Sequence, residues 1–100
     1  MIARMWEARA LPGRLDELAA LVAAAWPALA GTDGFAGGEV YRADSATDPR
    51  LVIITRWRDE ASLAAAAGPG WRDTAVTLPG EAALHSRPPH VWHFTPVPLD

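Results

Sequence analysis

The chain has 100 residues, half of them hydrophobic, and a formal net charge of −3 at pH 7. This length suits one small domain over residues 1–100, and mild acidity without a basic tract argues against a nucleic-acid-binding protein. Cysteine is absent, which excludes disulfides and sulfur-ligated metals; lysine, asparagine and glutamine are absent too, so all nine basic side chains are arginine. No apolar run approaches the roughly 20 residues of a membrane span, and we expect a cytoplasmic protein without membrane contact.

The first thirty residues predict a strand followed by an amphipathic helix. Residues 1–9 alternate, and one face of this strand carries Ile2, Arg4, Trp6 and Ala8. Apolar residues then recur at intervals of three and four over 11–29, which is typical of a helix with one buried face. We expect Pro27 to weaken or kink the last turn of this helix, and Gly31 to end it.

The middle of the chain predicts an antiparallel hairpin and a second helix. Residues 34–42 form the first strand of the hairpin, with a bulge or a close approach at its glycines. Residues 51–57 form its second strand, which is rich in β-branched residues, and a polar turn joins the two. Asp59 then caps a helix that Gly68-Pro69-Gly70 ends early.

The last third predicts short helical pieces over 71–78 and 81–85, and a fourth strand over 90–97. The resulting order, βαββαβ, is that of α+β ferredoxin-like domains with a four-stranded antiparallel sheet. Both faces of strand 51–57 are apolar for most of their length, as in a sheet that is buried on both sides. Because the helices cover one face only, we expect a second copy of the chain to cover the other, in a homodimer.

Several short motifs follow one another in the order of a known family. They are Gly34-Phe35, Gly38-Glu39-Val40-Tyr41-Arg42, Asp48-Pro49, Val52-Ile53-Ile54-Thr55-Arg56-Trp57 and Asp59-Glu60. On these motifs the sequence resembles the antibiotic biosynthesis monooxygenase (ABM) family. The resemblance implies a dimeric α/β barrel and, in the family's enzymes, oxidation of polycyclic phenols or quinols by dioxygen without metal or flavin. It also implies that Trp57 lines a pocket between the sheet and the helices.

Two departures from the family concern a second branch, which binds and degrades haem. The resemblance places that branch's first-strand asparagine at Trp6 and its haem-ligating histidine at Ala67, so we do not expect haem degradation. The chemistry that the resemblance implies needs no cofactor. A metal site is not expected either, because His90 and His93 point to opposite faces of an extended segment.

Aromatic side chains supply the candidate ligand site. If Trp6 and Trp57 face the helices, and Trp26 and Trp71 come from the helices, the four form a cage that suits a flat aromatic ligand. We expect Phe35 to contact the ligand as well. The alternative is that these residues pack the core or the dimer contact.

Three residues are candidates for the chemistry itself. Trp57 would shape the cavity, His93 would act as a general base, and Tyr41 would bond a phenol or ketone oxygen. Alternation places Tyr41 on the same strand face as Phe35. Arg72 is a candidate for holding an anionic or phenolate oxygen. For each of these residues a purely structural role is the alternative.

The leading hypothesis is a cofactor-independent monooxygenase that acts on an aromatic phenol or quinol. The alternative hypothesis is a non-catalytic dimeric binding or accessory protein of the same fold.

Overall fold

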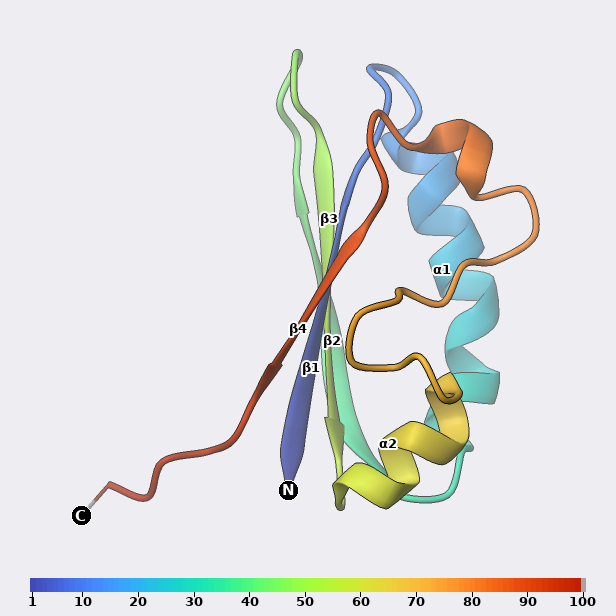
Figure 1. Cartoon of the computed structure of the whole chain (residues 1–100). Coiled ribbons are helices and arrows are strands. Elements are labelled where there is room, and N and C mark those ends of the chain that lie inside the picture. Colours follow the sequence, from blue (N-terminus) through green and yellow to red (C-terminus); the bar gives the residue numbers. More distant parts are fainter. Residues whose placement is uncertain (100) are drawn as a thin grey trace.

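The structure is a computed structural model that describes residues 1–99, and four strands and two α-helices make up most of it (Figure 1). In chain order the elements are β1 (Ile2–Arg9), α1 (Leu15–Ala30), β2 (Phe35–Ala43), β3 (Arg50–Trp57), α2 (Glu60–Ala67), the short 3₁₀ helix η1 (Ala82–Leu84) and β4 (His90–Phe94). The strands form one antiparallel sheet in the order β2-β3-β1-β4, and both α-helices cover the same face of it. The ferredoxin-like α+β fold predicted from the sequence is therefore confirmed.

The hydrophobic core lies between the sheet and the helices. Residues on the two central strands alternate strictly, so that Trp6 and Ala8 of β1 face the helices together with Leu51 and Trp57 of β3. The helices contribute Leu15, Leu18, Val22 and Leu63 to the same layer. Apolar side chains spaced at two on strands and at three or four on helices thus meet in one layer.

Both α-helices end at the glycines that the sequence predicts, and α2 also begins after its predicted cap. Asp59 caps α2 by accepting a hydrogen bond of 2.8 Å from the backbone N–H of Ser62, and Gly68 follows the last residue of α2. Helix α1 begins at Leu15, later than the periodic pattern from residue 11 suggests, and continues through Pro27 as far as Ala30, where Gly31 follows it. Thr32 Oγ1 and the N–H of Gly31 donate to the carbonyls of Ala28 and Pro27, which satisfies two of the acceptors that a helix leaves open at its C-terminus.

The prediction of a helical piece over 71–78 is wrong, because most of this segment has no regular structure beyond a turn at its start. In a helix the carbonyls of Trp71 and Thr74 would accept bonds from backbone N–H groups further along. Here both accept hydrogen bonds from the guanidinium of Arg4 on β1. The helical piece predicted over 81–85 appears as η1, and the fourth strand ends at Phe94 rather than at residue 97.

A bulge between Phe35 and Gly38 changes which residues of β2 share a face. Phe35 pairs with Trp57 and therefore faces the helices, whereas Tyr41 pairs with Val52 on the opposite face. The expectation that Phe35 and Tyr41 share a face is wrong for this reason, since one extra residue inverts the alternation of everything beyond it.

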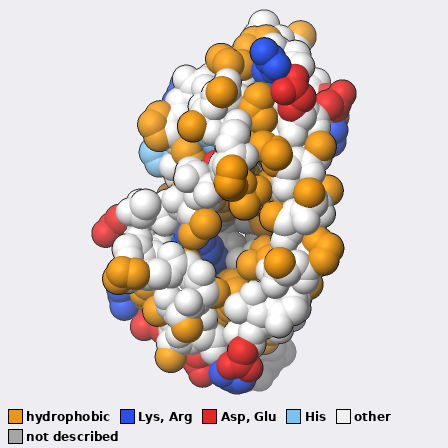
Figure 2. Space-filling model, turned by 90° about the vertical axis from the view of Figure 1, so that its right-hand side faces the viewer, with side chains coloured by type: hydrophobic (Ala, Val, Ile, Leu, Met, Phe, Trp, Pro, Cys, Tyr) orange, Lys and Arg blue, Asp and Glu red, His pale blue; other side chains and the backbone are white. Residues whose placement is uncertain are grey.

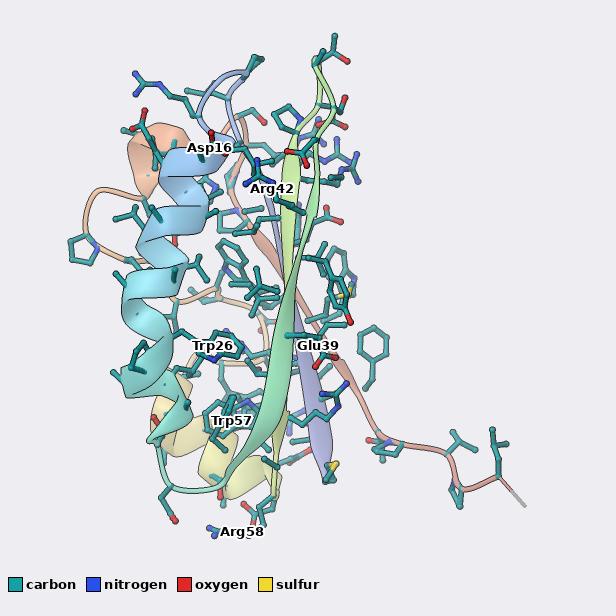
Figure 3. All side chains as sticks on the ribbon, turned by 180° about the vertical axis from the view of Figure 1, so that it is seen from behind. Asp16, Trp26, Glu39, Arg42, Trp57 and Arg58 are labelled. Atoms are coloured by element: carbon teal, nitrogen blue, oxygen red, sulfur yellow. The ribbon has the colours of Figure 1, made fainter. Side chains whose placement is uncertain are left out.

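The face of the sheet away from the helices is open, with exposed aromatic side chains beside charged ones. Tyr41, Trp92 and Phe94 on this face expose 55%, 41% and 51% of their surface. Arg56 forms a two-pronged ion pair with Glu39 here, at 2.9 and 2.6 Å, and Figure 3 places Glu39 across the sheet from Trp26 and Trp57.

Within residues 1–99, no helix has the length and apolar character needed to cross a membrane.

Candidate functional site: a tryptophan-lined pocket

A cavity of about 370 Å³ lies between the sheet and the helices, a volume within the usual range for small-molecule sites. The space-filling view shows it as a hollow with apolar side chains around it (Figure 2). The cavity is lined by Arg4, Trp6, Val22, Ala25, Trp26, Ala28, Leu29, Thr32, Ile53, Thr55, Trp57, Leu63, Ala66, Ala67, Val76, Leu78 and Glu81. Most of these side chains are apolar, so the cavity suits an apolar body with few polar groups.

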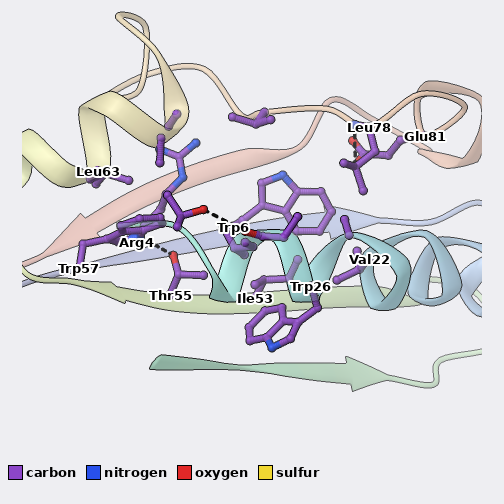
Figure 4. A pocket seen from close by; sticks show the side chains of 17 residues that line it. Arg4, Trp6, Val22, Trp26, Ile53, Thr55, Trp57, Leu63, Leu78 and Glu81 are labelled. Atoms are coloured by element: carbon purple, nitrogen blue, oxygen red, sulfur yellow. Dashed lines mark hydrogen bonds between the residues drawn. The ribbon is translucent and has the colours of Figure 1, made fainter. Parts of the chain in front are cut away.

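Trp57 is held rigidly at one end of the pocket (Figure 4). The side chain is 2% exposed, and its indole N–H donates a hydrogen bond of 3.0 Å to Thr55 Oγ1. Phe35 packs edge-on against the indole, with ring centres 5.5 Å apart, and Trp26 packs edge-on against Phe35 at 5.9 Å. Phe35 is absent from the lining, so it supports Trp57 from behind the pocket wall.

Three of the four tryptophans predicted to form a cage line this pocket. They are Trp6, Trp26 and Trp57. Trp71 follows α2 and lies outside the lining; its ring meets that of His93 edge-on at 4.8 Å. The tryptophans of the lining therefore come from β1, α1 and β3, without the contribution expected from the fourth tryptophan.

Two of the residues predicted to do chemistry are not presented to the pocket. Tyr41 lies on the open face, because of the bulge in β2. His93 faces the helices but does not line the cavity, and its Nε2 lies 3.0 Å from Arg4 Nη1, from which it accepts a hydrogen bond. Burial, followed by the nearby charge of Arg4, lowers the pKa of His93 below its ordinary value.

Arg72 does not reach the pocket either. Its guanidinium lies 4.5 Å from the ring centre of Trp71 and pairs with Glu60 at 3.4 Å, and both partners of that ion pair are largely exposed. Arg72 is therefore a surface residue that covers the outer side of Trp71. The prediction that it holds an anionic oxygen in the pocket has no support in this position.

The cation that does line the pocket is Arg4. Its strand face, shared with Trp6, was predicted from the sequence, but no role in the site was. The side chain is 7% exposed, and Nη1 donates a 2.6 Å hydrogen bond to the carbonyl of Trp71 while Nη2 donates one of 3.2 Å to that of Thr74. Burial lowers the pKa of Arg4. The sequence did contain a signal for Arg4: a charged residue on a strand face that is otherwise apolar is costly to bury and is therefore a candidate for a functional role.

An acidic residue, Glu81, also lines the pocket and was likewise missed. It is 1% exposed; one carboxylate oxygen lies 2.8 Å from His85 Nε2, and the other accepts a bond of 3.4 Å from the N–H of Leu78. The His85 ring meets Trp6 edge-on at 6.1 Å. Neither the Trp6 indole N–H nor His85 Nδ1 has a hydrogen-bond partner among residues 1–99. In the sequence, the spacing of four residues between Glu81 and His85 could have indicated that the two side chains meet on one side of a helical turn.

No group of three histidine or acidic side chains within residues 1–99 is arranged to hold a metal ion. A second hollow, of about 430 Å³, lies between α1 and the edge strand β2 and shares Trp26 with the first. It is lined by Ala19, Val22, Ala23, Trp26, Gly38, Glu39 and Val40, and the one charged residue among these, Glu39, is already paired with Arg56.

The family model described as "Antibiotic biosynthesis monooxygenase" matches residues 1–75, three quarters of the chain. The protein belongs to the ABM family. The match includes β1, both helices and the β2–β3 hairpin, and with them the three tryptophans and Arg4 of the pocket. Glu81 and His85 lie beyond the matched residues.

Solved structures of other ABM-like proteins have the same fold. Rv0793 from Mycobacterium tuberculosis is 20% identical, with a TM-score of 0.74 over 98% of this chain and 96% of its own. An antibiotic biosynthesis monooxygenase is 17% identical, with a TM-score of 0.75 over 98% and 100%. An asparagine-to-alanine mutant of SnoaB, a cofactor-independent oxygenase from Streptomyces nogalater, is 19% identical, with a TM-score of 0.64 over 98% and 95%. No curated protein matches the sequence.

Proposed function

We propose that this ABM-family protein is a cofactor-independent monooxygenase that oxidises an aromatic phenol or quinol. The observation that carries the proposal is the pocket: an apolar cavity with three tryptophans around it, in a chain of a family named for monooxygenases. Indole rings stack on flat aromatic molecules, and an apolar cavity excludes water from reactive oxygen intermediates. SnoaB, a cofactor-independent oxygenase, shares the fold, which agrees with the proposal at the level of fold alone.

The proposed reaction converts a phenol and dioxygen into a quinone and water. The hydroxyl loses its proton, and the resulting anion transfers one electron to dioxygen. The aryloxyl radical and superoxide then join through a new bond between a ring carbon and oxygen. Protonation gives a hydroperoxide, and loss of the ring proton with cleavage of the O–O bond releases water and leaves the carbonyl. The substrate supplies both the electrons and the protons, so the reaction is balanced without a further reductant.

Glu81 is the group that we assign to accept the hydroxyl proton. It is the one carboxylate among the side chains that line the cavity, and His85 lies directly behind it at 2.8 Å. A buried acid with a hydrogen-bonded partner is a typical proton-handling arrangement. This assignment replaces Tyr41, which lies on the other face of the sheet, and His93, whose Nε2 is bonded to Arg4.

The second candidate function is aromatic-ligand binding without turnover. One observation favours it: neither of the two polar residues first assigned to the chemistry reaches the cavity, while the apolar lining is complete. Under this alternative, aromatic molecules would quench the tryptophan fluorescence and no oxygen would be consumed.

An oxygen electrode tests the proposed function directly. We expect a panel of naphthols and quinols to include at least one compound whose oxygen consumption exceeds that of buffer, and Glu81→Gln to reduce that rate with the fold intact by circular dichroism. Trp57→Phe is preferred to Trp57→Ala, because removal of an indole that is 2% exposed would leave a cavity in the core. Ligand binding without oxygen consumption by any compound would contradict the proposal and support the second candidate.

We also propose that two copies of the chain pack through the open faces of their sheets. The support is the apolar surface of that face, where Tyr41, Trp92 and Phe94 are exposed beside the Arg56–Glu39 pair. Exposed aromatic side chains on one contiguous sheet face are characteristic of a protein interface.

A further inference from the structure

We infer that Arg4 is an anion-binding group of the pocket, and that the ligand is a flat aromatic molecule bearing an acidic group, either a carboxylate or an ionised phenol. The inference rests on the proposed function only in taking this cavity to be the ligand site; it does not depend on oxygen chemistry. The acidic group is distinct from the hydroxyl that we assign to react near Glu81.

The first argument is that Arg4 is buried without a counter-charge. Seven of the nine arginines have a carboxylate within 4.0 Å among residues 1–99, whereas Arg4 and Arg87 have none, and of these two only Arg4 is buried. Its hydrogen-bond partners are two backbone carbonyls and the neutral nitrogen of His93. A guanidinium removed from water without an anion is costly, and a ligand anion would offset that cost.

The second argument is that Arg4 retains donors that no residue uses. A guanidinium carries five N–H groups. The bonds to Trp71, Thr74 and His93 use three of these groups, two on Nη1 and one on Nη2. The Nε–H and the second N–H of Nη2 make no hydrogen bond within residues 1–99. Nε and Nη2 therefore each keep one donor for an oxygen anion, and a guanidinium can use donors on two nitrogens at once.

The third argument is the position of the charges around the cavity. Figure 4 places Arg4 beside Trp57 at one end and Glu81 at the other, with Trp6 between them. The carboxylate of Glu81 is bonded to His85 and to the backbone of Leu78, and it forms no ion pair with Arg4. Basic side-chain atoms are visible inside the hollow of Figure 2, and Arg4 is the basic residue among those that line it.

The arrangement therefore selects a ligand with two polar ends. An acidic group would meet the free donors of Arg4, the aromatic rings would pack against Trp57 and Trp6, and a hydroxyl at the far end would approach Glu81. A neutral aromatic of the same shape would fill the apolar part of the cavity but would leave the free donors of Arg4 without an acceptor.

The test uses two probes of the same shape and different charge, 2-naphthoate and 2-naphthamide, titrated calorimetrically into the whole chain. A charge-assisted pair should favour the acid by about tenfold or more in Kd. We expect Arg4→Met to abolish this preference and Arg4→Lys, which keeps the charge but loses the planar edge, to reduce it. Two matched controls should keep it: Arg14→Met, which removes an exposed arginine paired with Glu17, and Arg72→Met, which removes the surface cation nearest to Trp71.

Equal affinity of the wild-type chain for acid and amide would overturn the inference, as would the absence of naphthoate binding at millimolar concentration. Loss of the preference in Arg72→Met, or its persistence in folded Arg4→Met, would do the same. If neither Arg4 variant folds, NMR spectra of the wild-type protein with isotope-labelled arginine side chains test the inference instead. Naphthoate should then shift the Nε–H signal of Arg4 and leave that of Arg14 in place, and an unmoved Arg4 signal would refute the assignment.

Discussion

At the scale of single residues, the pocket depends on a few buried polar atoms whose partners come from distant parts of the chain. The indole N–H of Trp57 finds its acceptor two residues back on the same strand, at Thr55 Oγ1. Arg4 and His93 meet across the β1–β4 pairing, 89 residues apart in sequence. Such bonds contribute little net stability each, but loss of one partner leaves the other buried and unsatisfied.

Replacement of Thr55 by valine tests the bond that orients Trp57. Valine keeps the shape of threonine but cannot accept the indole N–H, so we expect a loss of about 1–3 kcal/mol in the free energy of unfolding, measured with urea. Thr47→Val, at an exposed turn position, serves as the control and should change stability by less than about 0.5 kcal/mol. Equal effects at the two positions would contradict the role given to Thr55.

The lowered pKa of His93 makes stability depend on pH. Because burial and then Arg4 disfavour the protonated ring in the folded chain, the unfolded chain takes up the proton first as the pH falls. The contribution of neutral His93 to the free energy of unfolding is present in full above the ordinary histidine pKa of about 6.5. It is lost as the pH falls towards the lowered pKa of His93 in the folded chain. We expect the unfolding free energy to fall from pH 7.5 to 5.5, and to fall less in His93→Gln. An unchanged pH dependence in the variant would refute this assignment.

At the scale of secondary-structure elements, the decisive feature is the bulge in β2. It sets which side chains face the helices, and it allows the backbone of β2 to approach β3 closely at Gly38. A Cβ atom at Gly38 would lie 2.3 Å from the carbonyl oxygen of Ile54 and 3.2 Å from the ring of Trp26. Backbone cannot move away as a side-chain end can, so glycine is required for this strand pairing.

Gly38→Ala is therefore expected to destabilise the fold by about 1–3 kcal/mol, as overpacking does. The urea midpoint of the variant would be compared with that of Gly31→Ala. A Cβ at Gly31, which has a negative φ of −85°, meets its nearest atom at 3.4 Å, so little change is expected there. A Gly38→Ala variant as stable as Gly31→Ala would contradict the close approach of the strands.

At the scale of the whole molecule, the sheet has one face covered by helices and one face open (Figure 1). The open face carries the exposed aromatic residues, the Arg56–Glu39 pair and a second charged group made of Glu7, Arg9 and Arg50. A chain of this size exposes a large share of its apolar surface when it is alone, and association through such a face is a common solution.

Sedimentation velocity at micromolar concentration tests the proposed dimer. We expect the wild-type chain to sediment as a dimer and Trp92→Glu to sediment as a monomer, because two copies would bury like charges against an apolar surface. Leu11→Glu introduces the same charge in the turn before α1, away from the open face, and should remain dimeric. A wild-type monomer would refute the proposed contact.

Local sequence patterns determined the strands, both α-helices and their order, because alternation and helical spacing depend only on near neighbours. The same patterns grouped the residues of each strand into two faces, and the pairing of β1 with β3 then brought Trp6 and Trp57 to the same face of the sheet. The positions of Tyr41 and of segment 71–78 were decided by the tertiary structure. A one-residue bulge inverted the facing of Tyr41, and the guanidinium of Arg4 took the carbonyls that a helix would have used. Arg4 and Glu81 acquired their places in the pocket only when β1, α2 and the segment before η1 came together, since no local pattern records a contact across 70 residues.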